Sequence, residues 1–324
     1  MNSIKKMMLS GALGCLISGM AYADGSSPQP VKPYWQDIQV VAVNKEKPRS
    51  SFMSYADRET ALTSRFEKSP YYSLLNGTWK FFFVDSYKDL PQNITDPSVN
   101  TSSWDDITVP GNWEVQGHGV AIYTNHGYEF KPRNPQPPLL PEANPVGVYR
   151  RDIEIPANWD NRDIYLHIGG AKSGLYVYLN GKEVGYSEDS KNPAEFLINK
   201  YLQPGKNVLT LKIFRWSTGS YLECQDFWRM SGIERDVFLW SQPKASIQDF
   251  RVVSTLDDTY TNGIFKLAVD LKNHTQETKN LNVGYELLDA KGNLVTSEAN
   301  DIWVSPASPQ TASFEYDLKN VAPW

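Results

Sequence analysis

Four carboxylates gather in one short stretch of the sequence, residues 220–237, beside three aromatic rings and two arginines. They are Glu223, Asp226, Glu234 and Asp236. A retaining glycosidase needs two carboxyl groups about 5–5.5 Å apart, so this stretch could supply a catalytic pair. The alternative is that Arg229 and Arg235 pair with these acids and hold a loop in place. The residue types favour the second interpretation, and they leave the first open.

The other reactive side chains form no known catalytic or metal motif. The spacing of the histidines does not match a zinc site; they are His118, His126, His167 and His274. Cys224 has no neighbouring histidine in the sequence to activate it, so we interpret it as a small apolar residue. The sequence also has neither a G-x-S-x-G nucleophile motif nor a glycine-rich phosphate loop.

Composition narrows the class of partner. The formal net charge is −5 and basic runs are absent, which argues against nucleic acid or an anionic membrane. Aromatic residues make up 13% of the chain, including ten tryptophans. This richness favours contact with carbohydrate, although the cores of β-sandwiches also use tryptophan and tyrosine.

The N-terminus predicts export. Lys5 and Lys6 precede an apolar run over residues 7–21, and "AYA" at residues 21–23 is a typical cleavage site before Asp24. We therefore expect residues 1–23 to be a signal peptide and the protein to reach the periplasm or the bacterial cell surface. The run is too short to span a membrane. Lipidation at Cys15 is the alternative.

The rest of the chain predicts an all-β protein. Residues 24–72 are polar and irregular, as expected for an extended arm, with helical character only near residues 57–68. Residues 73–242 contain short apolar and β-branched runs between turns, which predicts a sandwich of jelly-roll size. Asn180 and Gly181 mark a two-residue hairpin. Residues 126–145 are too rich in proline for a strand and predict a loop.

A second set of strands follows over residues 243–324 and predicts an immunoglobulin-like sandwich. Such a domain needs about 100 residues and seven strands. We therefore expect its last one or two strands to be missing and the chain to be a truncated protein.

Several blocks of sequence resemble one known family. They include "LLNGTWKF", "VPGNWEVQGHGVAIYTNHGYEF" and "SYLECQDFWRMSGIERDVFLW", and they are similar to the N-terminal region of family 2 β-galactosidases of the enterobacterial lactase type. The resemblance runs from about Trp35 to the end of the chain. It implies a jelly-roll sugar-binding domain and an immunoglobulin-like domain, followed in the family by a TIM barrel that carries two catalytic glutamates. The barrel blocks are absent here, so the resemblance implies no catalytic residue in this chain and no activity of the fragment alone.

Two residues match positions that contact galactose in the family. Asn125 ends the block "IYTN", and an amide can donate to one sugar hydroxyl while it accepts from the next. Asp226 lies in "ECQD" and would bind galactose and a sodium ion, because both prefer a carboxylate oxygen. The other sodium ligands come from the barrel in the family, so this chain would hold only part of that site.

The resemblance also implies magnesium and a homo-oligomer in the full-length enzyme. The positions that match a second magnesium site are Tyr34, Asp37, Val40, Glu188 and Thr218. Tyr34 and Thr218 replace aspartates of the family, which argues against this site here. The arm resembles a segment that crosses a subunit interface in the family.

Three functions therefore stand as hypotheses. The first is the N-terminal part of an exported β-galactosidase that removes terminal β-galactose by a retaining mechanism. The second is a stand-alone secreted carbohydrate-binding module. The third is a β-glucuronidase or β-mannosidase fragment of the same family.

Overall fold

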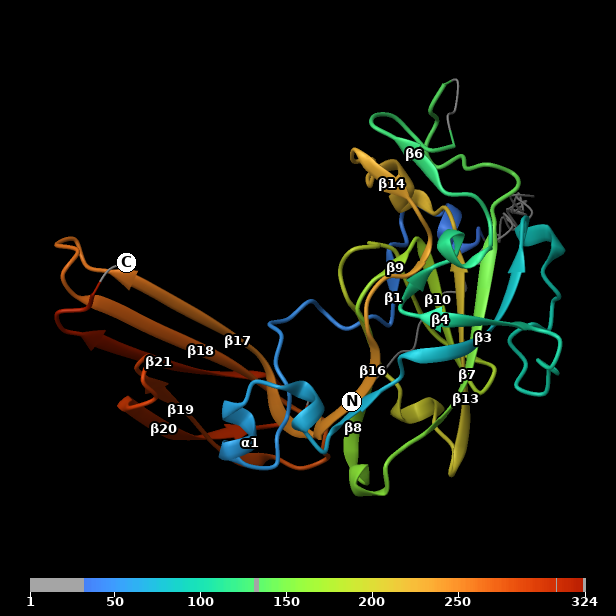
Figure 1. Ribbon diagram of the computed structural model, residues 1–324. Helices are drawn as coiled ribbons and strands as arrows, with labels where there is room; N and C mark the ends of the chain where they lie inside the picture. The colour runs from blue at the N-terminus through green and yellow to red at the C-terminus, as the bar shows by residue number, and fades with distance from the viewer. Residues whose placement is uncertain (1–31, 131–133, 307, 323–324) are drawn as a thin grey trace, which may run out of the picture. The chain divides into compact units, whose positions relative to one another are not determined.

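The computed structural model of the chain describes residues 32–130, 134–306 and 308–322 (Figure 1). The expected signal peptide, residues 1–23, and Cys15 lie outside these residues. Almost all regular structure is β-strand, and neighbouring strands are antiparallel, which confirms the all-β sandwich prediction. No helix in the described part of the chain is long and apolar enough to cross a bilayer.

The first sandwich contains two main sheets. The larger has the order β1-β11-β10-β13-β7-β3-β4 and the smaller the order β12-β8-β16-β2. The strands of the larger sheet are β1 (Ala42–Val43), β3 (Gly77–Val84), β4 (Asp105–Val109), β7 (Val146–Glu154), β10 (Gly174–Leu179), β11 (Lys182–Ser187) and β13 (Lys206–Phe214). Those of the smaller are β2 (Tyr72–Leu74), β8 (Arg162–Ile168), β12 (Ala194–Leu197) and β16 (Val237–Pro243).

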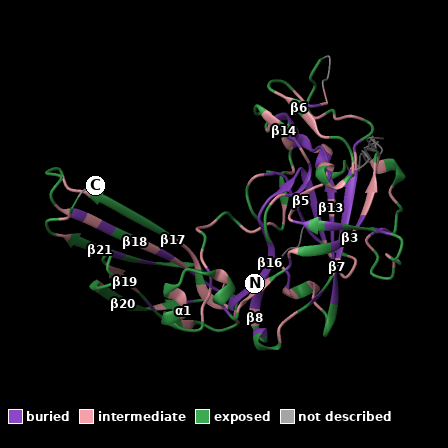
Figure 2. Cartoon of the chain, in the orientation of Figure 1, coloured by how far each residue is buried: buried purple, intermediate pink, exposed green. Residues whose placement is uncertain are grey.

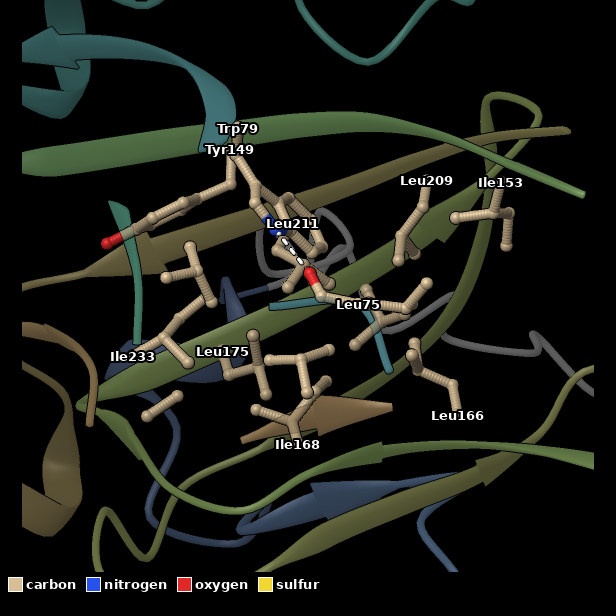
Figure 3. Close-up of a cluster of buried hydrophobic side chains, with 14 of the residues drawn as sticks. Leu75, Trp79, Tyr149, Ile153, Leu166, Ile168, Leu175, Leu209, Leu211 and Ile233 are labelled. Atoms are coloured by element: carbon tan, nitrogen blue, oxygen red, sulfur yellow. Dashed lines mark hydrogen bonds between the residues drawn. The ribbon is translucent and has the colours of Figure 1, made fainter. Parts of the chain in front are cut away.

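The core lies between these two sheets and follows the period of two that a strand imposes. Alternate residues of β13 (Leu209, Leu211) face alternate residues of β8 (Leu166, Ile168), as Figure 3 shows. The Trp79 indole N–H is buried in this core and donates to the Leu75 carbonyl at 2.8 Å, which satisfies its polar group.

The outer face of the larger sheet is also buried, and the arm covers it. Trp35 lies on the short 3₁₀ turn η1 (Tyr34–Gln36) and is only 2% exposed. Its ring stacks on Phe214 at 5.1 Å, while Tyr34 stacks on Tyr176 at 5.7 Å. The central strand β13 therefore buries both faces, which explains its continuous apolar run.

Two small sheets extend from the first sandwich. One has the order β5-β15-β9, with β5 (Gly111–Asn112), β15 (Gly232–Ile233) and β9 (Ala171–Lys172). The other is a two-stranded ribbon of β6 (Ile122–Thr124) and β14 (Phe227–Arg229). Residues 126–130 and 134–145 contain no strand, which confirms the predicted loop in its described part.

Helices are short. The only α-helix of the described residues is α1 (Arg58–Leu62), within the stretch where the sequence predicts helical character, and Asp57 caps it by accepting from the Thr60 N–H. The other 3₁₀ turns are η2 (Phe66–Lys68), η3 (Tyr87–Asp89), η4 (Glu114–Gln116), η5 (Ala157–Trp159), η6 (Asn199–Tyr201) and η7 (Thr218–Tyr221).

The second set of strands forms two further sheets. One has the order β17-β18-β21 and the other is the hairpin β19-β20. The strands are β17 (Ala245–Leu256), β18 (Gly263–Asn273), β19 (Lys279–Leu288), β20 (Leu294–Val304) and β21 (Gln310–Leu318). They enclose an apolar core that includes Leu271 and Val304, but Figure 2 shows far more exposed surface on them than on β7 or β13. The expected domain limits stay predictions.

Candidate functional site

The β6-β14 ribbon brings the two predicted site residues to one place. Thr124 pairs with Phe227 in the last step of the ladder. Asn125 directly follows β6 and Asp226 directly precedes β14, so both emerge from the same end of the ribbon. Two segments far apart in the sequence therefore meet here (Figure 1).

Two aromatic residues extend this site along the ribbon. Tyr123 and Trp228 are direct cross-strand partners, and their ring centroids lie 5.7 Å apart. Successive side chains of a strand alternate between faces, so Trp228 shares a face with Asp226. The Tyr123 hydroxyl donates to Asp226 Oδ1 at 2.8 Å, which shows that Tyr123 lies on that face too. The ribbon thus carries a polar end beside an aromatic wall.

All four residues of this face are accessible. The Tyr123 and Trp228 side chains are 55% and 52% exposed, and Asn125 and Asp226 are also exposed. Asn125 Oδ1 lies 2.7 Å from His126 Nδ1, so the neighbouring histidine orients its amide. Within the described residues the Asn125 amide nitrogen donates to no protein acceptor. Carboxylate, amide and aromatic ring are the groups with which proteins bind polar ligands that also have apolar faces.

A buried arginine holds the base of the ribbon. Arg215 Nη2 donates to the carbonyl of Val120, two residues before β6, at 2.9 Å, and to the carbonyl of Arg229, the last residue of β14, at 3.4 Å. Its Nη1 lies 3.5 Å from Glu114, whose carboxylate accepts from the Ser231 backbone N–H at 2.9 Å. Burial raises the pKa of Glu114, although the Ser231 bond and the Arg215 charge favour its ionised form.

The other three carboxylates of residues 220–237 hold the loop, but not in the way that the sequence predicts. Glu223 accepts from the Ser190 backbone N–H at 2.7 Å and from the Ser190 hydroxyl at 2.6 Å. Asp236 accepts from the Asn76 amide at 2.7 Å. Glu234 forms an ion pair with Lys191.

The predicted pairing of these acids with Arg229 and Arg235 was therefore wrong. Arg235 donates to the backbone carbonyls of Gly169 and Lys191. Arg229 is 1% exposed, donates to the Glu223 carbonyl at 3.4 Å, and lies 4.9 Å from the Phe227 ring. Neither arginine lies within ion-pair distance of a carboxylate in the described part of the chain. Peptide carbonyls bind Arg235, whereas Arg229 has one carbonyl partner and the Phe227 ring beside it, and its buried Nε and Nη2 have no hydrogen-bond partner among the described residues.

Asp226 thus differs from the other three acids, because it lies at the exposed end of the ribbon and its hydrogen-bond partner, Tyr123, belongs to the same ribbon. The surroundings of Cys224 favour the thiol over the thiolate. Its Sγ donates to the Ser220 carbonyl at 3.2 Å, and burial raises the pKa of the thiol, which keeps it protonated at neutral pH.

Two of the residues that match the second magnesium site, Glu188 and Asp37, have protein hydrogen-bond partners. Glu188 is buried, and its carboxylate already accepts from the hydroxyls of Tyr186 and Thr218 and from the Gly219 N–H, at 2.7, 2.9 and 2.6 Å. Asp37 accepts from the Gln39 N–H of its own turn. Burial raises the pKa of Glu188 despite these bonds. No group of three metal-ligating side chains occurs among the described residues.

Two segments of the sequence match two domains of one family of known proteins. Residues 72–243 match "Glycosyl hydrolases family 2, sugar binding domain", and residues 245–324 match "Glycosyl hydrolases family 2". The chain belongs to glycosyl hydrolase family 2. The ribbon, with both predicted site residues, lies within the sugar-binding match of this family 2 chain.

Curated relatives of the family 2 chain carry one name. A beta-galactosidase of Priestia megaterium is 37% identical over 90% of this chain, and one of Psychromonas ingrahamii is 36% identical over 81%. The chain spans 29% and 24% of the length of these relatives. Among solved structures, a Bacteroides uniformis beta-glucuronidase matches this chain with a TM-score of 0.63 and 20% sequence identity. The match covers 78% of this chain and 28% of the glucuronidase chain. This likeness shows the fold alone.

Sequence reasoning named Asn125 and Asp226 and missed Tyr123 and Trp228. The signal was present. In "IYTN" Tyr123 and Asn125 are two residues apart, and so are Asp226 and Trp228 in "DFW". Each spacing places its two residues on one face of a strand.

Proposed function

We propose that this chain is the N-terminal part of a β-galactosidase that hydrolyses terminal non-reducing β-D-galactose residues. The carrying observation is the ribbon end, where Asn125 follows one strand and Asp226, held by Tyr123, precedes the other. Relatives named beta-galactosidase support the sugar, since they match the segments that contain both residues. In this proposal the catalytic acid/base and nucleophile are two glutamates outside these 324 residues.

The ribbon residues would bind and orient galactose. In this proposal the Asp226 carboxylate accepts hydrogen bonds from sugar hydroxyls. The Tyr123 hydroxyl binds Oδ1, so Oδ2 can accept from the sugar. The Asn125 amide can donate to an adjacent hydroxyl. Asp226 is also a suitable oxygen ligand for sodium, with the remaining ligands supplied from outside this chain. One carboxylate is only part of such a site.

Kinetics of the full-length protein test this function. We expect 4-nitrophenyl β-D-galactoside to be hydrolysed with retention of configuration, and kcat/KM to fall about 100-fold in Asp226→Ala and in Asn125→Ala, because each loses bonds to the sugar. Asp258→Ala, at an exposed turn position, is the matched control and should keep the wild-type rate.

Three results would contradict the proposal. Turnover by the purified 324-residue chain would place catalytic groups inside it. A preference for β-glucuronides or β-mannosides would move the assignment to another activity of the family. Galactoside binding by the 324-residue chain in calorimetry, with no hydrolysis by any longer product of the gene, would favour a stand-alone binding module.

We propose in addition that the protein is exported and that the full-length form is a homo-oligomer. Export rests on the pattern of residues 1–23. N-terminal sequencing of the protein from the periplasm should begin at Asp24, whereas a lipidated Cys15 at the N-terminus would contradict cleavage there. Sedimentation should give a mass above that of one chain.

A further inference from the structure

The rings of Tyr123 and Trp228, the aromatic wall of the ribbon, offer a second kind of contact beside its polar end. Tyr123 and Trp228 are each more than half exposed, although burial of large rings is strongly favourable. Their planes are inclined by 59°, so they form an angled surface, not a closed stack. Such a pair presents ring faces to a ligand.

The position of this surface relative to Asp226 suggests its ligand. Trp228 is two residues from Asp226 on the same face, a separation of about 7 Å along a strand. That distance is on the scale of one sugar unit. When galactose occupies the polar end, the group attached to its anomeric carbon can extend over the rings.

We propose that Tyr123 and Trp228 form a platform for the leaving group of the substrate, the aglycone. This inference rests on the proposed function and deepens it. The platform favours aglycones with an apolar face, such as an aryl ring or the C–H face of a second sugar, since both pack on an indole. Both rings are accessible, and Trp228 has the larger of the two.

The base of the ribbon supports this role. Arg215 links Val120 to Arg229, so both strands have a common anchor beneath the rings. The platform is thus fixed on paired strands, which limits the ordering cost when a ligand packs against it.

The test compares two substrates of the full-length protein, 4-nitrophenyl and methyl β-D-galactoside. In Trp228→Ala we expect the ratio of their kcat/KM values, aryl over methyl, to fall about fivefold or more. Trp228→Phe retains a ring and should restore at least half of the preference. Trp303→Ala removes a 66% exposed tryptophan from β20 and is the matched control, with an unchanged ratio.

Each outcome decides the inference. An unchanged ratio in Trp228→Ala, with a melting temperature equal to wild type, overturns the platform. An equal fall in Trp303→Ala shows a nonspecific effect and overturns it too. If the wild-type enzyme prefers glucuronides, the proposed function fails, and the same ratio measured with aryl and methyl glucuronides still judges the platform.

Discussion

Tyr123 combines two properties that a single residue rarely offers at a binding surface. Its ring packs against Trp228, and its hydroxyl fixes one oxygen of Asp226. The bond to Asp226 raises the pKa of the Tyr123 hydroxyl, because an ionised phenol would repel the carboxylate. In the proposed galactose site, Tyr123 is thus a positioning residue for Asp226.

Removal of that hydroxyl should weaken sugar binding and leave folding intact. In Tyr123→Phe of the full-length protein we expect kcat/KM for aryl and methyl galactosides to fall by a similar factor, about fivefold, as for one lost charge-assisted hydrogen bond at an accessible site. The ratio between the two substrates should hold, because the ring remains. Tyr260→Phe, at a 73% exposed position, is the control. Wild-type kinetics in Tyr123→Phe would contradict the positioning role.

At the scale of single residues, the sequence predicts which side chains belong to the candidate site better than it predicts which groups they bind. Asn125 and Asp226 could be identified from the sequence blocks that resemble the family. The partners of Arg229 and Arg235 could not be identified from the sequence. A guanidinium has five N–H donors, and these can donate to peptide carbonyls as well as to carboxylates. Which acceptor it meets depends on segments distant in the chain, such as Gly169, which directly follows β8 and accepts from Arg235.

Next to the ribbon, the strands β5, β15 and β9 approach one another closely. Gly232 in β15 has φ +115°, and a Cβ there would lie 2.8 Å from the Gly111 carbonyl oxygen and 3.0 Å from the Tyr149 hydroxyl. Only glycine fits both the backbone conformation and the space. The residue thereby sets the packing directly after β14.

Gly232→Ala should therefore destabilise the protein strongly. We expect a loss of more than about 2 kcal/mol in the free energy of unfolding, from backbone strain plus steric overlap. Gly205→Ala separates the two causes, because Gly205 has φ +75° and nothing within 4 Å of its Cβ position. This control should lose about 1 kcal/mol. Equal losses in denaturant titrations of the two variants would contradict the packing argument.

Elements formed by local rules were predictable, and elements formed by distant pairing were not. Asn180 and Gly181 have φ of 53° and 77°, as a tight hairpin between β10 and β11 requires. The strand β18 (Gly263–Asn273) lies in the segment where the sequence predicts a second set of strands. By contrast, β5, β9 and β15 have two residues each, too few to show any period.

For the whole molecule, the arm acts as a structural part of the first sandwich. Arg49 binds Glu195 of β12 through two hydrogen bonds, 3.0 and 2.9 Å long. Glu195 also accepts from the Trp240 indole at 3.0 Å and contacts His167 Nδ1 at 2.8 Å. Burial alone would raise the pKa of Glu195, but the bond from His167 and the charge of Arg49 outweigh it and lower the pKa.

This cluster predicts how stability depends on pH. A carboxyl whose pKa is lower in the folded state stabilises the fold above its ordinary pKa, and that contribution disappears as the pH falls through the folded value. We expect the melting temperature to drop as the pH decreases from about 5 towards 3. Glu195→Gln should lose about 3 kcal/mol at pH 7 and show a flatter profile.

The control for this prediction is Glu154→Gln, at an exposed position of β7. It should keep the wild-type stability and the wild-type pH profile. A Glu195→Gln profile as steep as that of wild type would show that other groups cause the acid sensitivity.

The ribbon also imposes an order in time. The first strand of the ribbon, β6, ends at Thr124, and the second, β14, begins only at Phe227. During synthesis β6 therefore leaves the ribosome before its partner strand has been made. At about 5–20 residues per second the delay is on the order of 5–20 s. Throughout this interval the segment with Tyr123 and Asn125 has no strand to pair with and is open to other chains. The surface that combines Tyr123, Asn125, Asp226 and Trp228 can therefore form only after residue 228 has been synthesised.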